Sequence, residues 1–325
     1  MNVLLLGGNG LLGHNVLKAL LHRGHSVCAL VRRRESLHTE AMPAVERLTV
    51  LEGSLLDDRV LEAAAEGCDA IVNCAGVTDM SLLRYEDYLP VNRDLCRRLT
   101  QLMERQGIVR LVHTGTANTI GYGAPAAPAT EETPMEAPFT RSFYAQSKRA
   151  GEELLLQAAA AHPDWHVVVV CPGFMVGAYD TKPSSGALLL AGYRKRLMPV
   201  PGGGKSFVPV ADAAEAVVNG LTQGRSGQRY LLTGENLSLK EFYALQAQVC
   251  GYRQRLVTLP DGLLRLAGWL GDGLRWLGIR TQLSTRNVQQ LMVREYYDNR
   301  RSRDELTMPA TPLAHAIADF FAWRG

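Results

Sequence analysis

The first half of the chain alternates between short apolar runs and longer segments in which apolar residues recur every three or four positions. The runs are typical of buried strands and the repeat is typical of amphipathic helices. The pattern predicts strands at Val3–Leu6, Ser26–Val31, Arg47–Glu52, Ala70–Cys74, Arg110–Thr114 and His166–Val170. It predicts helices at Leu12–Arg23, Val60–Gly67, Asn92–Gln106 and Tyr144–Ala161. Strands that alternate with long helices indicate right-handed βαβ crossovers, so we expect an α/β fold with a doubly wound parallel sheet.

The rhythm changes after Pro172, where glycine and proline become frequent and the strand signals thin out. A helix at Ala211–Leu221 and a strand at Gln228–Leu232 are expected to return to the main sheet. The remainder predicts a smaller, mostly helical C-terminal cap. The expected division is a main domain of residues 1–175, completed by about 207–233, and a substrate-binding cap of residues 176–206 and 234–325.

Two apolar segments raise the question of targeting and membranes. The N-terminal "MNVLLLGGNG" lacks the basic start of a signal peptide and predicts the first strand. The segment Leu263–Ile279 is interrupted by Arg265, Asp272 and Arg275 and contains four glycines, so it is not expected to span a bilayer. We expect two short buried helices there, with a membrane-surface patch as the alternative.

Composition narrows the class of protein. The 325 residues are 46% hydrophobic and 21% charged, with a net charge of +3, which is ordinary for a globular protein and gives no reason to expect a nucleic-acid partner. The six cysteines form no CxxC pair, and neither they nor the eight histidines show metal-ligand spacing. We therefore expect no metal site, reduced core cysteines and a cytoplasmic location.

A glycine-rich turn follows the first predicted strand and opens the first predicted helix. Gly7, Gly10 and Gly13 have G-x-x-G-x-x-G spacing, which allows a tight turn, a close approach of a pyrophosphate and close packing of helix on sheet. The turn predicts a dinucleotide site; the alternative is a glycine-rich turn that binds nothing.

The end of the second predicted strand indicates whether the dinucleotide is NAD or NADP. An acidic residue there would accept hydrogen bonds from a ribose 2′-hydroxyl, whereas this chain has Arg32, Arg33 and Arg34. A guanidinium suits a 2′-phosphate, so NADP is favoured over NAD. The alternative is that the arginines form only a solvated turn.

Tyr144 and Lys148 lie four apart on a predicted helix, a spacing that also occurs by chance. With the glycine turn, they resemble the extended short-chain dehydrogenase/reductase family, also called the NAD-dependent epimerase/dehydratase superfamily. The turn matches the family's cofactor loop and the pair matches its Y-x-x-x-K motif. "VHTGTANTIGYG" places Thr116 at the family's active-site serine or threonine, and Asn92 matches the asparagine of its fourth helix.

Later segments extend the resemblance over nearly the whole chain. "CPGFMVG" matches a segment that lines the nicotinamide, and "FVPVADAAEAV" matches one that closes the sheet. The chain is most similar to the dihydroflavonol-4-reductase-like group, in which Arg32 holds the NADP-reading position. The resemblance implies a Rossmann-type fold and catalysis by Thr116, Tyr144 and Lys148. It implies cofactor binding by Gly7, Asn9, Gly10, Leu11, Gly13, Arg32, Ser54, Leu55, Cys74, Ala75, Thr114, Tyr144, Lys148, Pro172 and Phe174.

Three positions depart from the family pattern. Ser54 stands where many members have an aspartate that contacts adenine, and Cys171 replaces a common arginine before Pro172. Gly115 and Thr116 replace a serine pair, which leaves one hydroxyl for the chemistry.

The expected reaction is hydride transfer to a carbonyl. Tyr144 would supply the proton, and the nearby Lys148 cation would lower the pKa of the phenol toward neutrality. The Thr116 hydroxyl would hold the substrate oxygen beside Tyr144. The nicotinamide would supply the hydride.

The substrate is less closely determined. The expected pocket residues are mainly apolar or aromatic, which suits a carbonyl on a hydrophobic body; they are residues 78–88, Tyr122, Phe139, Phe143, Phe174, Met175, Tyr179 and cap residues up to Met198. Arg194, Lys195 and Arg196 could instead grip a diphosphate, although a solvated helix face is favoured. Three functions stay open: an NADPH-dependent carbonyl reductase, an NAD-dependent nucleotide-sugar epimerase or dehydratase, and a non-catalytic dinucleotide sensor. A homodimer is also open.

Overall fold

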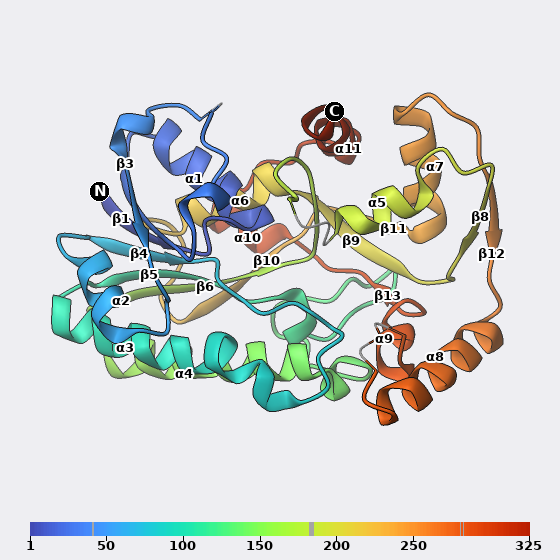
Figure 1. Ribbon diagram of the computed structural model, residues 1–325, viewed down its shortest axis with the longest axis horizontal. Helices are drawn as coiled ribbons and strands as arrows, with labels where there is room; N and C mark the ends of the chain where they lie inside the picture. The colour runs from blue at the N-terminus through green and yellow to red at the C-terminus, as the bar shows by residue number, and fades with distance from the viewer. Residues whose placement is uncertain (41, 182–184, 280, 282) are drawn as a thin grey trace.

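A computed structural model of the chain describes residues 1–40, 42–181, 185–279, 281 and 283–325 (Figure 1). Its central element is a seven-stranded parallel sheet in the order β10-β6-β5-β4-β1-β2-β3. The strands are β1 (Asn2–Leu6), β2 (Ser26–Val31), β3 (Leu48–Glu52), β4 (Ala70–Asn73), β5 (Arg110–Thr114), β6 (His166–Pro172) and β10 (Gln228–Leu232). Strand order reverses at β1, so the sheet is doubly wound and its switch point lies between β1 and β4.

Helices cover both faces of this sheet (Figure 1). One face carries α1 (Leu11–His22) and α6 (Val210–Asn219), and the other carries α2 (Asp58–Ala65), α3 (Leu95–Gln106) and α4 (Phe143–Ala161). β1 shows why: Val3 and Leu5 pack under α1, whereas Leu4 and Leu6 pack on the opposite side. A strand buried on both faces reads as a continuous apolar run, which is why the pattern predicted it.

The predicted elements of the first half are confirmed to within a few residues. β2 and β5 have the predicted bounds, and β10 pairs with β6 as expected. The helix predicted from Asn92 begins earlier, with a π-helical turn at Pro90–Asp94 that continues into α3.

The rest of the chain contains two small sheets as well as helices. β7 (Phe174–Val176), β9 (Gly204–Pro209), β11 (Glu235–Ser238) and β13 (Arg294–Glu295) form one, and β8 (Leu197–Val200) and β12 (Arg255–Thr258) form the other. The helices are α5 (Gly186–Gly192), α7 (Leu239–Val249), α8 (Asp261–Trp276), α9 (Thr285–Gln290), α10 (Arg300–Glu305) and α11 (Leu313–Arg324). Phe207, Phe242 and Phe320 belong to a separate apolar core in this part of the molecule.

The prediction of two short buried helices at 263–279 is wrong. The segment belongs to one helix, α8, whose buried residues are Gly268 and Gly271. A Cβ at Gly271 would lie 2.1 Å from the Leu283 carbonyl oxygen, so α8 packs on the segment before α9 through glycines. Leu263, Leu266, Leu270 and Leu274 therefore point outward, whereas Leu264 is half-buried. None of the helices in the described ranges is long and apolar enough to cross a membrane.

Candidate active site

The glycine turn lies between β1 and α1, where the three glycines have different roles. Gly7 has φ +75°, and a Cβ there would lie 2.5 Å from the Ala75 backbone nitrogen. A Cβ on Gly13 would lie 2.0 Å from the Gly7 carbonyl oxygen, whereas one on Gly10 would meet only that oxygen at 3.5 Å. Gly7 and Gly13 thus permit close packing, and Gly10 leaves an open backbone face for a ligand.

The start of α1 suits an anion. Gly10 caps the helix without a side-chain hydrogen bond, and its first turn, which begins at Leu11, contains no acidic residue. Unpaired N–H groups and the positive end of the helix dipole favour a phosphate. Asn9 faces the 3-10 turn that follows β2, where its amide donates to the Ser36 hydroxyl over 3.2 Å. These residues fit a dinucleotide pyrophosphate.

The tips of β2 and β3 lie next to this turn. The Arg32 and Arg33 side chains are exposed and make no ion pair within the described part of the chain, whereas the Arg34 guanidinium donates to the Val50 carbonyl over 2.9 Å. A carboxylate is nevertheless present at this edge: Glu52, opposite Val31 in the sheet, accepts from the Arg34 backbone N–H. Beyond β3, Ser54 is exposed and Leu55 is half-buried.

The carboxyl ends of β4 and β5 connect the turn to α4. Cys74 and Ala75 follow β4 against Gly7, and the Thr114 hydroxyl at the end of β5 donates to Cys74 Sγ over 3.6 Å. Lys148 Nζ, from α4, donates to the Thr114 carbonyl. A Cβ atom added to Gly76 would lie 3.6 Å from Lys148 Nζ. The glycine turn, the carboxyl ends of β4 and β5, and Lys148 of α4 thus lie next to one another, although they are far apart in the sequence.

Asn92, in the π-helical turn, holds two of these segments together by hydrogen bonds. Its Oδ1 accepts from the Val77 N–H over 2.8 Å, and its Nδ2 donates to the Val77 carbonyl and the Ser147 hydroxyl. The fully buried amide therefore ties the segment after β4 to the middle of α4.

The three candidate catalytic residues lie together. Thr116 follows β5 and caps a short 3-10 turn, with its Oγ1 accepting from the Asn118 N–H over 3.3 Å. Tyr144 lies in the first turn of α4, and its phenol is hydrogen-bonded to the Thr116 side chain. Lys148 follows one helical turn later and is buried. Pro172 ends β6 in the sheet, whereas Phe174 begins β7 and packs edge-on against Phe207 at 5.2 Å between ring centroids.

The expected lowering of the phenol pKa is not found. Burial raises the pKa of Tyr144 above its ordinary value, and the hydrogen bond from Thr116 offsets this only in part. Burial also lowers the pKa of Lys148. Desolvation is the largest cause for both groups, so the charged form of each is disfavoured.

Glu152, one turn beyond Lys148, is an additional site residue that the sequence did not indicate. Its Oε1 accepts from the Thr116 N–H over 3.3 Å, and its Oε2 lies 2.9 Å from the Thr119 hydroxyl and 3.3 Å from Arg229 Nε. Burial raises the pKa of this fully buried carboxyl, while Arg229 lowers it. The i, i+4 spacing from Lys148 was a signal that could have identified it.

Two departures from the family pattern are explained by this carboxyl. A Cβ at Gly115 would lie 2.3 Å from Glu152 Oε1, so the position next to Thr116 has no room for a serine. Cys171 of β6 is fully buried in place of the common arginine, and the guanidinium beside Glu152 comes from Arg229 of β10 instead. The two strands are neighbours, with Leu231 opposite Cys171.

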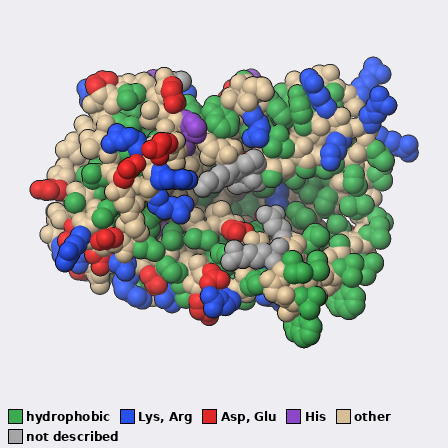
Figure 2. All heavy atoms as spheres, in the orientation of Figure 1, with side chains coloured by type: hydrophobic (Ala, Val, Ile, Leu, Met, Phe, Trp, Pro, Cys, Tyr) green, Lys and Arg blue, Asp and Glu red, His purple; other side chains and the backbone are tan. Residues whose placement is uncertain are grey.

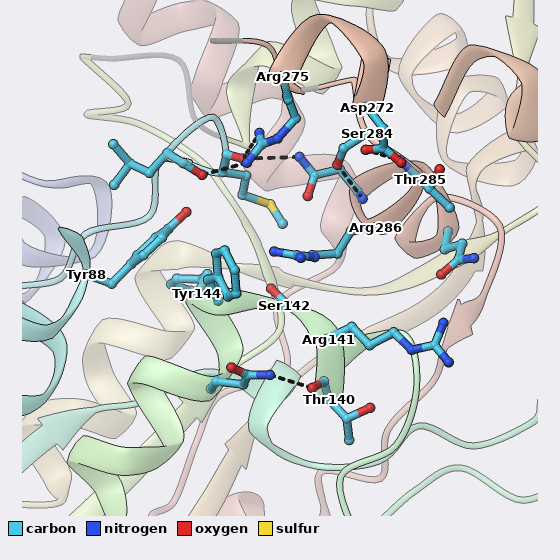
Figure 3. A pocket seen from close by; sticks show the side chains of 16 residues that line it. Tyr88, Thr140, Arg141, Ser142, Tyr144, Asp272, Arg275, Ser284, Thr285 and Arg286 are labelled. Carbon is cyan, nitrogen blue, oxygen red and sulfur yellow. Dashed lines mark hydrogen bonds between the residues drawn. The ribbon is translucent and has the colours of Figure 1, made fainter. Parts of the chain in front are cut away.

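A cavity of about 530 Å³ opens beside Tyr144 (Figure 3). Its walls come from the segment after β4, the start of α4, α8 and the segment through α9. The apolar and aromatic side chains that line it are Met80, Leu82, Tyr88, Phe143 and Tyr144; the charged ones are Arg141, Asp272, Arg275 and Arg286. The others are neutral and polar, so the cavity is more polar than the sequence predicted; they are Thr140, Ser142, Gln146, Ser284, Thr285, Asn287 and Gln289.

Several predicted pocket residues lie elsewhere. Tyr122 donates to the Ala137 carbonyl and packs on the fully buried Phe139, and Tyr179 stacks on His14 beside the glycine turn. Phe174, Met175 and Met198 pack onto the apolar cores. Arg194, Lys195 and Arg196 do not line the cavity; they are exposed on a turn after α5 rather than on a helix face.

The arginines of the cavity differ in what they contact. Arg275 donates to the carbonyls of Leu82 and Thr281, at 2.7 and 2.9 Å, and so ties α8 to the segment after β4. Arg286 lies over the Phe143 ring, 4.0 Å from its centroid, and extends into the cavity on the side of Tyr144 (Figure 3). Burial and the Arg275 charge lower the pKa of Arg286. No carboxylate pairs with it among the described residues, so it can receive a polar or anionic ligand group.

Within the described ranges no group of three or more His, Cys, Asp or Glu side chains is placed to hold a metal ion.

The chain is similar along most of its length to proteins of known activity or structure. The chain is 29% identical to "Sterol demethylase protein B" of Methylococcus capsulatus, over 99% of this chain and 98% of that protein. It is 31% identical to a 4-hydroxy-2-methyl-3-oxo-4-farnesyl-3,4-dihydroquinoline-1-oxide ketoreductase of Stigmatella aurantiaca, over 84% of this chain and 80% of that protein. Among solved structures, MoeE5 in complex with UDP-glucuronic acid and NAD shares the fold with a TM-score of 0.77, at 20% identity over 100% and 99% of the two chains.

The sequence model of one family matches most of the Rossmann-type sheet. It is described as the NAD dependent epimerase/dehydratase family, and it matches residues 3–232, from β1 to the end of β10. The match includes the glycine turn, Thr116, Tyr144 and Lys148. This protein is an enzyme of the NAD dependent epimerase/dehydratase family, the extended short-chain dehydrogenase/reductases.

Proposed function

We propose that this protein is an NADP-dependent oxidoreductase that interconverts a carbonyl and a hydroxyl group on a small molecule with an apolar body. The observation that carries the proposal is the contact between the Thr116 and Tyr144 hydroxyls beside the cavity, one helical turn from Lys148. The glycine turn of Gly7, Gly10 and Gly13 would hold the dinucleotide, whose nicotinamide would supply the hydride chemistry. Residues 1–175, completed by 207–233, would bind the dinucleotide, and residues 176–206 and 234–325 would close over the substrate.

The side chains of this site would divide the remaining work. Thr116 Oγ1 orients the substrate oxygen next to Tyr144, and Tyr144 Oη gives it a proton during reduction or removes one during oxidation. Lys148 holds the end of β5 through the Thr114 carbonyl and brings a positive charge to the site. The phenol of Tyr144 is protonated at neutral pH and so can give a proton, although burial raises its pKa and makes it a weaker acid in the absence of ligands.

The cofactor preference rests on Arg32. Its guanidinium is exposed at the tip of β2 without an ion-pair partner among the described residues, which suits a 2′-phosphate. Glu52 accepts from a backbone N–H at the same edge, but its carboxylate belongs to the neighbouring strand. NAD remains the alternative.

The substrate proposal rests on the cavity and on the relatives. Met80, Leu82 and Phe143 give a mainly polar cavity one apolar wall, which suits the apolar body of a substrate that also carries polar groups, and about 530 Å³ suits a mid-sized ligand. Two relatives carry a sterol or a farnesylated quinoline in their names. Arg286 adds a preference for a substrate with a polar or anionic group near the reacting oxygen.

A second candidate is a nucleotide-sugar epimerase or dehydratase that uses NAD. The observation in its favour is that Arg141 and Arg286 line the cavity, where they could pair with a diphosphate.

The location and the oligomeric state also belong to the proposal. The six free cysteines suit a reducing compartment, so we propose a cytoplasmic location. A homodimer is proposed as well.

The test is Tyr144→Phe, assayed by NADPH consumption with a panel of hydrophobic ketones. Removing the proton donor should lower kcat by roughly a hundred-fold or more, while calorimetry should show NADPH affinity within a few-fold of wild type. Tyr122→Phe is the matched control because its hydroxyl contacts only the Ala137 carbonyl outside the cavity. If the Tyr144 variant kept more than about a tenth of wild-type kcat, Tyr144 would not be the acid.

Thermal-shift measurements with cofactor present separate the two candidates. Ligand-linked stabilisation follows RT ln(1 + [L]/Kd), so a millimolar ligand with micromolar affinity gives a clear shift. A shift with UDP- or dTDP-sugars and none with the ketones would replace the reductase by the epimerase.

A further inference from the structure

Exposed apolar side chains gather at one edge of the molecule. In the described ranges, all large apolar residues that are exposed, except Met1 and Val45, lie in β8, β12 or between residues 263 and 291. Trp269 and Trp276 are 69% and 88% exposed. Figure 2 shows the hydrophobic atoms grouped at the lower right, where Figure 1 places α8. A contiguous apolar surface of this kind is rare without a partner.

The apolar side of α8 faces away from the protein. Leu263, Leu266, Leu270, Leu274 and Leu277 recur every three or four residues and are all exposed, so they form one stripe along the helix. The buried side is made by Gly268 and Gly271. Trp269 and Trp276 are seven residues apart and lie side by side along one margin of the stripe.

The apolar surface continues onto the two-stranded sheet that precedes α8. Leu197 of β8 and Val257 of β12 are exposed, while their neighbours Met198 and Leu256 pack inward on the core. Alternate residues of a strand point to opposite faces, so Leu197 and Val257 share the outer face of this sheet with Arg255, which is paired with Leu197. β12 ends at Thr258, three residues before α8 begins at Asp261, so the two surfaces are continuous along the chain.

Five cations lie at the far end of that sheet. Arg194, Lys195 and Arg196 precede β8, and Arg253 and Arg255 lie at the start of β12; all are exposed. The parallel pairing places the two strand starts side by side, with the Arg255 N–H donating to the Arg196 carbonyl over 2.9 Å. None of the five pairs with a carboxylate within the described chain. Figure 2 shows this positive cluster at the upper right, above the apolar surface.

We propose that this edge docks the protein on the surface of a bilayer that contains anionic phospholipids. We call it the α8 edge: the leucine stripe and two tryptophans of α8, Leu197 and Val257, and the five cations. An amphipathic helix with leucine and tryptophan on its outer side lies in the interface of a bilayer rather than across it. Cations beside it are attracted to anionic headgroups, and tryptophan favours the headgroup level.

Charge argues against a second copy as the occupant. A two-fold contact through the α8 edge would pair this edge with a copy of itself, so each five-cation cluster would need negative charge somewhere on the same edge. The sequence from 250 to 294 contains only Asp261 and Asp272 as acidic residues, and Asp272 accepts from the Thr285 N–H. The edge therefore lacks the negative charge needed to pair with a copy of itself, whereas an anionic bilayer supplies it.

The other side of α8 borders the cavity. Asp272 and Arg275 line it opposite Tyr144, and α9 adds Arg286 (Figure 3). A ligand dissolved in the outer part of a bilayer would therefore meet the cavity one helix thickness from the membrane surface. This consequence rests on the proposed function, whereas docking itself does not.

The test is co-sedimentation of the full chain with vesicles of phosphatidylcholine alone or of equimolar phosphatidylcholine and phosphatidylglycerol. We expect binding to the anionic vesicles that weakens as salt increases. Leu266→Glu with Leu270→Glu should weaken it by roughly ten-fold or more, because the charges enter the apolar stripe. Arg194→Gln with Lys195→Gln should weaken it by roughly several-fold, because two headgroup contacts are lost.

Matched controls lie on other faces of the protein. Val45→Glu places a charge on an exposed apolar residue elsewhere, and Lys18→Gln with Arg59→Gln removes two exposed cations elsewhere; neither should change binding. Sedimentation measures no turnover, so it distinguishes a failure of docking from a failure of the proposed function. Absence of binding, or equal binding by the Leu266→Glu/Leu270→Glu variant, would overturn the proposal. A dimer in light scattering that Leu270→Glu dissociates, without vesicle binding, would assign the edge to a second copy.

Discussion

Helices α4 and α8 differ in what they turn toward the protein: the inner side of α4 carries both polar and apolar side chains, whereas that of α8 is built around two glycines. The inner side of α4 carries polar groups that are fully or nearly fully buried, among them Ser147, Lys148 and Glu152. The inner side of α8 carries Gly268 and Gly271, and the leucines at 263, 266, 270 and 274 face outward. An amphipathic pattern thus shows that a helix has two different faces. It does not show which of the two faces is buried against the protein.

The reason for the difference lies in the partners of each helix. Every buried polar side chain of α4 named above has a hydrogen-bond partner from another element: Asn92 for Ser147, Thr114 for Lys148, and Thr116 for Glu152. Such partners offset the loss of hydration. α8 approaches its neighbour so closely that only glycine fits between them. The buried polar side chains of α4 therefore form part of the candidate active site, whereas the exposed apolar side chains of α8 indicate a surface that binds a partner.

Replacing Glu152 should have the largest effect on stability. Glu152→Ala leaves the mostly buried Arg229 guanidinium without its counter-ion, and removal of one member of a buried pair destabilises by about 3–5 kcal/mol. Glu152→Gln keeps an acceptor for the Thr116 N–H and should lose less. Urea unfolding measures both, with the exposed Arg265→Ala of α8 as the control. Equal stability of Glu152→Ala and wild type would show that the carboxyl is not held by these contacts.

A pair of leucine truncations tests the comparison directly. Leu155→Ala on the inner side of α4 removes a fully buried side chain and should lower the free energy of unfolding by about 2–5 kcal/mol. Leu270→Ala removes a side chain that is 57% exposed, so the change should stay within about 0.5 kcal/mol. Denaturant titration of both variants gives the two values. A large loss for Leu270→Ala would mean that the stripe is covered in the free protein.

A buried imidazole in α1 extends the comparison to pH. His14 Nε2 accepts from the His38 N–H over 3.1 Å and Nδ1 faces the Gly10 carbonyl, so the ring is held neutral. Burial lowers the pKa of His14 from 6.5 to about 4. Stability from the neutral ring is therefore fully present above pH 6.5 and is lost as pH falls toward 4, by up to about 3 kcal/mol.

The measurement is urea unfolding at several pH values between 7.5 and 4.5 for wild type and His14→Gln. The variant should lose less stability over this interval, because it has no proton to take up at this position. His22→Gln, at the exposed end of the same helix, is the control. Parallel pH curves for wild type and His14→Gln would contradict the assignment.

The smallest expected effect concerns a side chain that, like the α8 stripe, points away from the protein. Arg32→Ala should weaken NADPH by about 1–3 kcal/mol, the range for a hydrogen bond to a charged group, and leave NADH nearly unchanged. Calorimetric titration with each cofactor measures the difference, with Arg59→Ala as the exposed control. Equal losses for the two cofactors would mean that Arg32 does not read the 2′-phosphate, and Arg33 would be tested next.

The sequence by itself determined the sheet, the glycine turn and the Tyr144–Lys148 pair. These depend on short-range regularities: a buried strand is a run of apolar residues, and a helix repeats about every 3.6 residues. The turn is readable because its glycines are needed for backbone contacts within a few residues and with the next strand. Thr116 was found because it matches a family segment, and its proximity to Tyr144 agrees with that match.

Only the tertiary structure decided the rest, because it depends on segments far apart in the chain. Arg286 reaches the ring of Phe143, and Arg229 reaches Glu152 from a strand added late to the sheet. The raised pKa of Tyr144 follows from burial of the phenol, which cannot be predicted from the spacing of residues along a helix. The outward turn of α8 follows from the close approach of Gly268 and Gly271 to the segment before α9, a contact that no local pattern of apolar residues records.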